Sequence, residues 1–588
     1  LQKRLNVETL VLRRAVIDLE RNTAGENNWS DFTSASGDDD VGSELGLSGF
    51  TMGGVELTDS NITWLDVSTG KRFKISKMKL ATEAVVEGQP LPVTFKAYVR
   101  SNQPEWQASV FVKTNFEFDD DSPVFNANKL KLVVKAQLPS SDLEKISIAM
   151  ITDGEINVQT QTAKLSKVRL SILGLVMSGE LDVENIFSVP VIHGPLKVKT
   201  FEAQTLAERL KVTMPRMENT QRFRDISLSA LFKTDFDSIY LDDIAANIDE
   251  SSVNGFIHIS NFQQPVVSYD LDVDNVNLHD YRAADDASGK NELPLPLDLI
   301  RSSDLEGTLD IETVTVDDDI QLKEFHITSQ IKDGIVEADP ITMLVGESEV
   351  DATMRLDASN TPEGVFSINV NNVDATASIN PLLKTITGNE ALVLEGLVNA
   401  TASFQVTGES VVELKKSAKG TVKITMDEPL VQGIDINHAS RSVVSDYANK
   451  NGFRTRKSYV TEYKPDRKTR FDNLSATFKV ANGKWVNNDL LLVSKEANIT
   501  GSGSIDFINS KLDYRPVIDV NVNSRVDIRD KLRDHPMEYH AYGRFEKVTY
   551  KFDVDKYELL VGRLLIQEAK TRSIKQKKSN TWNKYKSK

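Results

Sequence analysis

The sequence has no cysteine among its 588 residues. This absence excludes disulfides, thiolate nucleophiles, cysteine-ligated zinc and iron–sulfur clusters. No window approaches eighteen uninterrupted apolar residues, so we expect no helix that spans a bilayer. Basic residues are fewer than acidic ones: the sequence has 70 Lys and Arg and 86 Asp and Glu, which gives a formal net charge of −16. That balance argues against broad binding to nucleic acids, which needs a basic surface.

The chain also has neither an initiator methionine nor a signal peptide. The first residues already show the apolar–polar alternation of a strand. We therefore expect a trimmed or processed chain whose first residue lies within a folded region. Its length is too great for one ordinary core, which predicts several domains or a repeat array.

A repeated stretch organises what is present. Residues 323–360 align at a fixed offset and without a gap inside the stretch 470–509, so that Phe325 matches Leu474. Residues 225–261 form a third, looser copy. Units that cannot bury their own apolar face must stack on one another, which predicts a quasi-one-dimensional architecture.

Alternation of apolar and polar residues runs through most of the chain. In residues 129–138, for example, Leu130 and Leu132 point to one face and Lys131 to the other. Such a period of two is typical of strands with one dry and one wet face. Asp153-Gly154 and Asn482-Gly483 indicate turns between these strands, as do Asp333-Gly334 and 362–364. Short strands that follow one another directly favour antiparallel meanders over βαβ units.

The number of strands limits how they can pack. If a strand and its turn take about 15 residues, the chain holds roughly 40 strands, which would span on the order of 150–200 Å at about 4.8 Å per strand. Half-buried strands on so long a sheet cannot share one compact core. Either the sheet curls into a trough with an apolar inner face, or it breaks into sandwiches. A trough lined with apolar side chains would need a ligand or partner to cover it.

Helices are few, and we expect them to cap or cross the sheet. The candidates are residues 381–387, 410–418, 436–450 and 557–570. The last has an apolar stripe of Tyr557, Leu560, Val561 and Leu564. A polar and then Pro-rich stretch at 285–296 is the best internal boundary. From Thr571 the chain has seven Lys and Arg and no acidic residue, which predicts a disordered basic tail that is a candidate membrane-surface contact.

Candidate chemical sites are weak. His535, Glu538 and His540 suggest metal ligands, but their spacing fits neither a helix face nor a strand face, so we expect no metal site. Three Asp triplets lack the pattern of a calcium loop. Gly501-Ser-Gly503 lacks the Lys and helix of a phosphate loop, so its glycines indicate close backbone approach or a bend. The basic segment 454–470 reads as a solvated loop or as a contact for acidic lipid or protein. No Ser/His/Asp set suggests itself, and we predict no catalytic residue, no cofactor and no enzymatic activity.

Several stretches resemble the AsmA family of Gram-negative envelope proteins. They are the opening LNVETLVLRRAVIDLERNTAGENNWSDF, the segment IAANIDESSVNGFIHIS, the segment LPLDLIRSSDLEGTLDIETVTVDDDI, the segment VQGIDINHASR and the long segment RFDNLSATFKVANGKWVNNDLLLVSKEANITGSGSIDFINSKLDY. The resemblance implies a mainly β fold, a long curled antiparallel sheet that forms a repeating, taco-shaped β-groove with few short capping helices. It divides the chain into the remainder of an N-terminal segment and hinge (1–36), a first groove region (44–283), a C-terminal groove region (295–556) and an amphipathic helix with a basic disordered tail (557–588).

The resemblance also implies a place and a role. Family members have their body in the periplasm and a transmembrane helix in the inner membrane, an anchor that we do not expect within residues 1–588. They are linked to phospholipid movement towards the outer membrane and to its homeostasis. We therefore expect a conduit that carries phospholipids between the two membranes. Envelope proteins are possible further partners, and nucleic acid is not.

The candidate lining is a set of in-phase apolar residues, although which face forms the groove is open. The set is Val350, Ala352, Met354, Leu356, Ile499, Ile505 and Phe507. A second hypothesis is an assembly factor or scaffold that binds protein partners at sheet edges and has a dry interior. A third, a polysaccharide-binding solenoid, needs aromatic platforms, whereas the five Trp repeat in no register.

Overall fold

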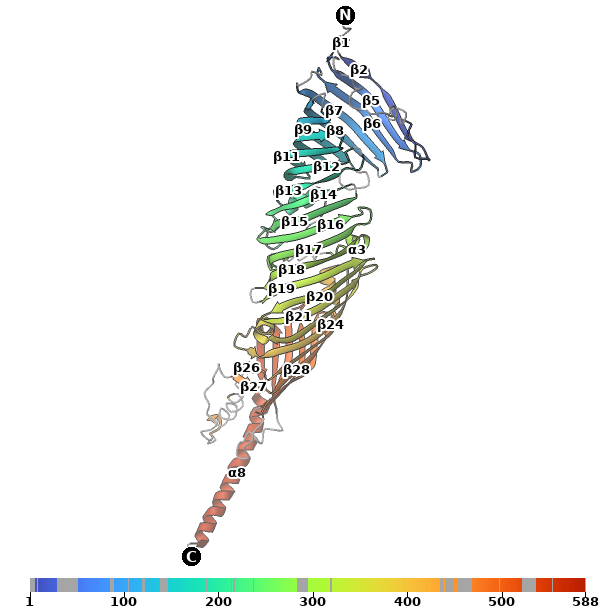
Figure 1. Cartoon of the computed structure of the whole chain (residues 1–588). Coiled ribbons are helices and arrows are strands. Elements are labelled where there is room, and N and C mark those ends of the chain that lie inside the picture. Colours follow the sequence, from blue (N-terminus) through green and yellow to red (C-terminus); the bar gives the residue numbers. More distant parts are fainter. Residues whose placement is uncertain are drawn as a thin grey trace. The chain divides into compact units, whose positions relative to one another are not determined.

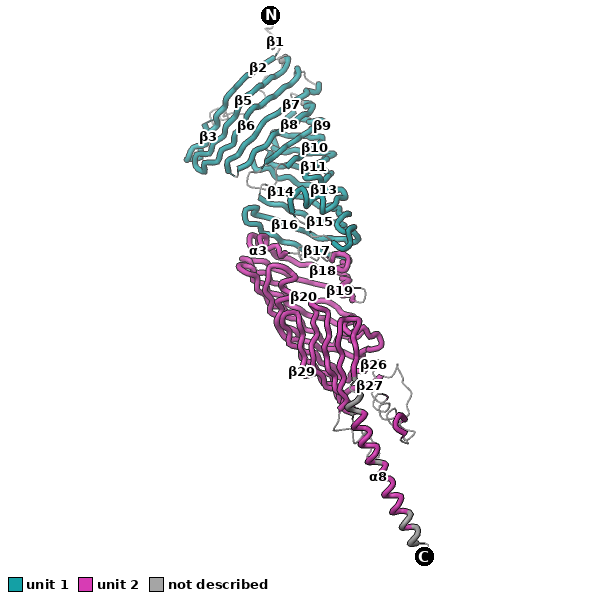
Figure 2. The backbone as a smooth tube through the Cα atoms, turned by 180° about the vertical axis from the view of Figure 1, so that it is seen from behind, with its two compact units in different colours: residues 1–274 teal, residues 275–588 magenta. Residues whose placement is uncertain are grey.

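A computed structural model gives the structure of the chain as two compact units, Leu1–Asp274 and Asn275–Lys588 (Figure 2). Strands make up 66% of the described structure, and within each unit nearly all of them belong to a long sheet that is not closed. The structure describes the chain from Asn6 to Lys586 except residues 8, 29–50, 85–88, 104, 119–121, 138–145, 187, 213, 215–216, 236, 283–293, 318–319, 434–437, 439–448, 453–467, 496, 521–535 and 553.

The first unit holds a ladder of strands (Figure 1). They are β1 (Asn6–Val7), β2 (Leu10–Arg13), β3 (Val16–Arg21), β4 (Thr51–Met52), β5 (Val55–Asp66), β6 (Arg72–Thr82), β7 (Leu91–Asn102), β8 (Glu105–Phe118), β9 (Val124–Gln137), β10 (Ile146–Asn157), β11 (Thr162–Ile172), β12 (Leu175–Glu184), β13 (Val191–Phe201), β14 (Ile226–Thr234), β15 (Ser238–Ile248), β16 (Ser251–Ser260) and β17 (Val266–Asn277).

The second unit is also built mainly of successive strands. Its strands are β18 (Asp304–Asp317), β19 (Ile320–Lys332), β20 (Ile335–Val345), β21 (Ser348–Asp357), β22 (Glu363–Asp374), β23 (Val393–Glu395), β24 (Leu397–Thr407), β25 (Lys419–Asp427), β26 (Leu430–Gln432), β27 (Lys468–Arg470), β28 (Asn473–Ala481), β29 (Lys484–Val493), β30 (Ala497–Asp506), β31 (Lys511–Val520), β32 (Met537–Arg544) and β33 (Lys547–Phe552). Three of them, β23, β26 and β27, form a small separate sheet.

Sequential neighbours pair antiparallel along each ladder, as the short connections predict. The exceptions are parallel: β1 with β4, and β2 and β3 with the two halves of β5. The repeat is confirmed, because β19–β21 and β28–β30 occupy the matching residues of the two aligned stretches. The looser copy holds β14–β16. Each repeat is therefore a meander of three strands.

A β-bulge interrupts many strands near their middle. Register shifts recur in pair after pair, for example between Thr152 and Gly154 on β10. Polar residues with positive φ sit at several of them, among them Lys77, Lys129, Lys167 and Asp243. Each bulge bends its strand and increases its twist, so a row of bulges creases the sheet. The Asp153-Gly154 turn prediction is therefore wrong, because this pair lies inside β10 at a bulge.

Side-chain packing within the second unit requires its sheet to curl. The helices α4 (Ala375–Ser378) and α5 (Asn380–Thr387) follow β22, yet Ile386 on α5 clusters with Leu512 on β31 and with Ala541 on β32. In a flat sheet β22 and β31 would lie about 29 Å apart, whereas α5 is about 12 Å long. The sheet therefore bends back on itself, and α4–α5 lie across its concave side.

The other helices are α2 (Ala203–Leu210), α3 (Leu297–Ser302), α6 (Val411–Ser417) and α8 (Val554–Lys586). The predictions for 381–387 and 410–418 are confirmed by α5, which ends at Gly388 with a positive φ, and by α6, capped by Ser410. Most of 436–450 lies outside the described residues. The prediction of a disordered tail after residue 570 is wrong, because the helix continues to Lys586.

Two buried apolar clusters lie in the second unit. The larger joins α4, the small sheet, β24, β25, β29–β32 and the start of α8, with Met426, Phe471, Met537 and Val561 almost completely buried. Leu560 and Leu564 pack against it, so three of the four residues of the predicted stripe are in this cluster or against it. This end of the unit is thus filled with side chains.

Candidate groove

The face opposite the charged residues forms one apolar surface in the first unit. A single cross-strand row runs through β2 and β5–β17, and every member is apolar. It consists of Leu12, Leu57, Leu80, Phe95, Val112, Leu132, Met150, Leu170, Met177, Val198, Leu228, Ala246, Val253 and Val273. We call this face the groove face and the opposite one the polar face.

Most large side chains on the groove face of the first unit remain partly open to solvent. Phe95, Leu132, Met150 and Leu170 are all half-buried. The residues that are almost fully buried in this unit are mostly small, such as Ala127 and Ala97, or lie at the crease, such as Val168. The groove face therefore keeps apolar surface exposed to solvent, and an apolar ligand could still bury that surface.

Aromatic side chains gather at the strand ends of the same face. Trp64 on β5 lies 5.7 Å from Phe73 on β6, and Phe73 lies 6.3 Å from Trp106 on β8, measured between ring centroids. This cluster could not be predicted from the sequence, because the strand register that brings Trp64 and Trp106 together is not visible from their spacing. Amphipathic rings at the margin of an apolar surface are suited to a boundary between hydrocarbon and water.

The first strands of the second unit also carry an apolar cross-strand row, and we call the face that bears it the groove face of that unit. There the row is Leu309, Ile327, Ile341, Ala352, Ile368, Ala402, Val422 and Phe478. Ala352 and Met354 are half-buried on this face, while Val350 and Leu356 are buried on it. Ile499 lies inside the larger buried cluster, and Ile505 and Phe507 pack against the smaller one. The proposed lining residues therefore share one face, but of the first group only Ala352 and Met354 remain partly open to solvent.

The row in the second unit ends at a polar residue. Asn487 on β29, next after Phe478, is completely buried, and its amide donates to the Thr477 carbonyl at 3.0 Å and to Asp489 at 2.7 Å. Its oxygen accepts a 2.6 Å hydrogen bond from the Tyr514 hydroxyl. Burial, together with the Asp489 charge, raises the pKa of Tyr514 far above its usual value, so this hydroxyl stays a donor.

Gly501 and Gly503 make room for Tyr514. A Cβ at Gly501 would lie 2.8 Å from the Tyr514 ring, and one at Gly503 would lie 2.7 Å from it. The prediction that these glycines allow close approach is confirmed, because any larger residue would displace the ring. The tyrosine lies across the groove face at β29–β31, where the open surface ends.

Histidines pair with carboxylates on the polar face. His258 contacts Asp242 at 2.8 Å, and His540 contacts Asp513 at 2.8 Å. His326 lies between Asp310, at 2.7 Å, and the Thr328 hydroxyl, at 3.2 Å. This set resembles a catalytic relay, and sequence analysis missed it. Asp310 and His326 stand directly opposite one another in the β18–β19 register, so the set fits a cross-strand polar contact.

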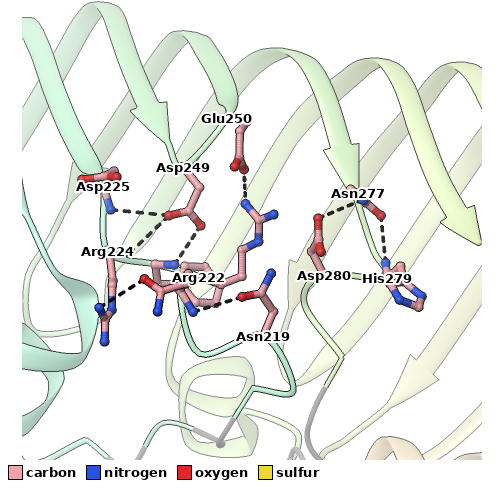
Figure 3. A network of polar contacts seen from close by, with 11 residues as sticks. Asn219, Arg222, Arg224, Asp225, Asp249, Glu250, Asn277, His279 and Asp280 are labelled. Carbon is pink, nitrogen blue, oxygen red and sulfur yellow. Dashed lines mark hydrogen bonds and ion pairs between the residues drawn. The ribbon is translucent and has the colours of Figure 1, made fainter.

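A further polar network anchors the loop after α2 (Figure 3). The Asp249 carboxylate accepts hydrogen bonds from the backbone amides of Phe223 and Arg224, at 2.8 and 3.2 Å, and Arg222 pairs with Glu250. In a separate turn Asn277 donates to Asp280 at 2.8 Å. These contacts tie the loop to the turn between β15 and β16, so the network fixes the strand-end loop.

Neither a membrane helix nor a metal cluster is found in the described part of the chain. No helix there is long and apolar enough to cross a bilayer. No group of three or more His, Asp and Glu side chains there could hold a metal ion. The Asp triplets and His535 lie wholly or mostly outside the described residues, as does most of the basic segment 454–470.

Comparison with known proteins gives one match. The model of the AsmA family matches residues 1–490, which is most of the chain. The search of curated proteins and the search of solved structures gave no match.

Proposed function

The chain belongs to the AsmA family, and on that premise we propose that it is a non-enzymatic conduit for phospholipids in the periplasm, between the inner and outer membranes. Membership in the family is consistent with a role in envelope lipid transport or assembly. Acyl chains would lie along the groove face while head groups stay in water at the open side. Outer-membrane biogenesis and homeostasis would depend on that transfer.

The observation that carries the proposal is the unbroken apolar row of the first unit. All of its members except the exposed Leu12 and the buried Val198 are half-buried, and the row holds no polar residue between Leu12 and Val273. Each methylene that such a surface removes from water contributes about 0.8 kcal/mol at full burial. Because the row is continuous, a lipid that moves from one strand to the next keeps its chains covered throughout.

The test is lipid content after gentle purification, measured by native mass spectrometry and lipid extraction. We expect bound phospholipid, which is reduced severalfold by Met150→Asp in the first unit and by Met354→Asp in the second. A carboxylate on the groove face would have to be desolvated by the acyl chain. A chain that is lipid-free and does not take up fluorescent lipid would refute the conduit.

Matched controls lie on the opposite face of the sheet. Ile151→Asp follows Met150 on the same strand, where Ile151 is 52% exposed, and Val365→Asp replaces a side chain that is 44% exposed on β22. Both controls introduce the same charge, so lipid content should stay at the wild-type level. Equal loss in variants and controls would mean that charge or stability, and not the groove face, determines loading.

A scaffold role is the second candidate, and two observations favour it. The end of the second unit has the dry interior that this role requires. Val16 and Ile17 on the edge strand β3 are 67% and 45% exposed, and edge strands accept partner strands. A partner protein captured by wild type and lost with Val16→Pro, while lipid content is unchanged, would favour the scaffold.

A further inference from the structure

The polar face of four adjacent strands in the first unit is strongly basic. Ten Lys and Arg on β6–β9 are all exposed, whereas these strands carry only two carboxylates, Glu105 and Glu117. The ten are Arg72, Lys74, Lys77, Lys79, Lys96, Arg100, Lys113, Lys129, Lys131 and Lys135. We call this surface the basic face. It contrasts with the formal net charge of −16 for the chain.

Like charges stand directly opposite one another on the basic face. The strand register pairs Lys74 with Arg100, Lys79 with Lys96, and Lys113 with Lys131. Such pairs destabilise a sheet. No ion pair between described residues involves any of the ten side chains. The free fold thus carries a repulsion that an anionic partner would relieve.

Apolar rings lie between these charges. The Lys77 ammonium is 5.5 Å from the centre of the Tyr98 ring, and the Lys96 ammonium is 5.4 Å from that of Phe111. Tyr98 is 56% exposed. Lysine stems and tyrosine rings have an apolar body and a polar tip, which suits a boundary between water and hydrocarbon.

We propose that the basic face docks the first unit on an anionic lipid bilayer. Eight of the ten residues are Lys, whose flexible stems carry point charges and do not need fixed bidentate partners. The charges spread over four strands, about 14 Å across, so a broad surface can meet them together. Each basic residue near an anionic bilayer contributes about 1 kcal/mol. The inference goes beyond the conduit and does not depend on it.

A second copy of the chain is the competing occupant, because β15–β17 carry five Asp and no Lys or Arg. Those carboxylates are fewer, and some are already engaged. Asp242 contacts His258 at 2.8 Å, and Asp274 accepts a 2.8 Å hydrogen bond from the Ser252 amide. The bilayer is favoured for that reason.

The experiment is vesicle flotation with the full chain. Vesicles of phosphatidylcholine alone are compared with vesicles in which phosphatidylglycerol replaces about a third of the lipid, at low salt and at about 0.15 M salt. The test variant carries Lys74→Gln, Lys96→Gln, Lys113→Gln and Lys131→Gln. The matched control carries the same change at four exposed lysines of the second unit, Lys332, Lys419, Lys423 and Lys479. A third variant neutralises Lys570, Lys575 and Lys578 on α8.

Wild type, the control and the α8 variant should bind the anionic vesicles, more weakly at higher salt, and the test variant should bind at least about tenfold more weakly. Wild type should not bind phosphatidylcholine. The urea midpoint of wild type should rise with salt more than the urea midpoint of the test variant, because the variant has lost the repulsion. A cooperative urea transition of the test variant shows that it is folded. Unchanged vesicle binding by the test variant, or loss only in the α8 variant, would overturn the proposal. So would a dimer seen by light scattering that the test variant loses without any change in vesicle binding.

Discussion

The groove face is open in the first unit and closed at the end of the second. Met150 and Met426 both lie on this face, yet Met150 is half-buried and Met426 is 1% exposed. The difference does not come from the strands, which alternate alike in both places. It comes from segments that cross the sheet, namely α4–α5 and the first turns of α8, which supply Ala375, Ile386 and Val561 to the buried clusters. The same repeat therefore forms an open surface that can bind a ligand where no helix covers it, and a buried core where helices do.

The largest expected effect is at the covered end. Val561→Asp would place a carboxylate at a position with no solvent exposure, inside the larger cluster. An uncompensated buried charge costs about 3–5 kcal/mol, so the second unit should unfold at markedly lower urea. Leu559→Asp is the control on the same helix, where Leu559 is 65% exposed, and it should have little effect. Equal effects would mean that α8 does not close the core.

A matched pair of methionines sharpens the comparison directly. Met426→Ala should lower the free energy of unfolding by about 2–5 kcal/mol, since it opens a cavity in a dry core. Met150→Ala should cost about 1 kcal/mol or less, because its side chain is already half in water. Urea unfolding of both variants gives the measurement. Similar losses at the two sites would contradict an open face in the first unit.

The polar residue that ends the row should have a smaller effect. Asn487→Ala leaves the Tyr514 hydroxyl without its buried acceptor, which costs about 1–3 kcal/mol. Tyr514→Phe removes the donor and keeps the ring across the face, so its cost should be smaller. Thermal unfolding ranks the two variants. A reversed order would mean that the hydrogen bond does not hold the tyrosine in place.

Much of this architecture could be predicted from the sequence. The repeat and its alternation located β19–β21, β28–β30 and the apolar face of each strand, because strand periodicity is local, but they left open which face forms the groove. The sequence could not separate Val350 from Ile499, because the two occupy matching positions of the repeat. Segments distant in sequence pack around Ile499 in the larger cluster, whereas Val350 belongs to neither cluster. The Trp64–Phe73–Trp106 cluster escaped notice for the related reason that it depends on register between strands.

Asp153-Gly154 was misread for a different reason. Asp-Gly is a strong hairpin signal, but here the carboxylate caps a bulge. Asp153 accepts a 2.9 Å hydrogen bond from the Lys129 amide and a 2.9 Å contact from the Lys167 ammonium. The bulge leaves an amide without a ladder partner, and the aspartate supplies one. The crease of the groove therefore depends on polar side chains that a turn prediction cannot distinguish from loop residues.

The smallest expected effect is a loss of stability at low pH when Asp153, the cap of the bulge, is protonated. The hydrogen bond from the Lys129 amide, followed by that from Lys167, lowers the pKa of Asp153 from 3.8. A depressed folded pKa means that the carboxylate stabilises the fold at neutral pH and that this contribution is lost as pH falls through the folded pKa. Asp153→Asn should thus lower the urea midpoint slightly relative to wild type at neutral pH, and this difference should vanish at acid pH. Glu155→Gln on the same strand is the control, and its difference from wild type should be the same at both pH values. If the Asn variant stayed equally destabilised in acid, lost geometry rather than lost charge would explain the effect, and the crease would not be held by an ionised cap.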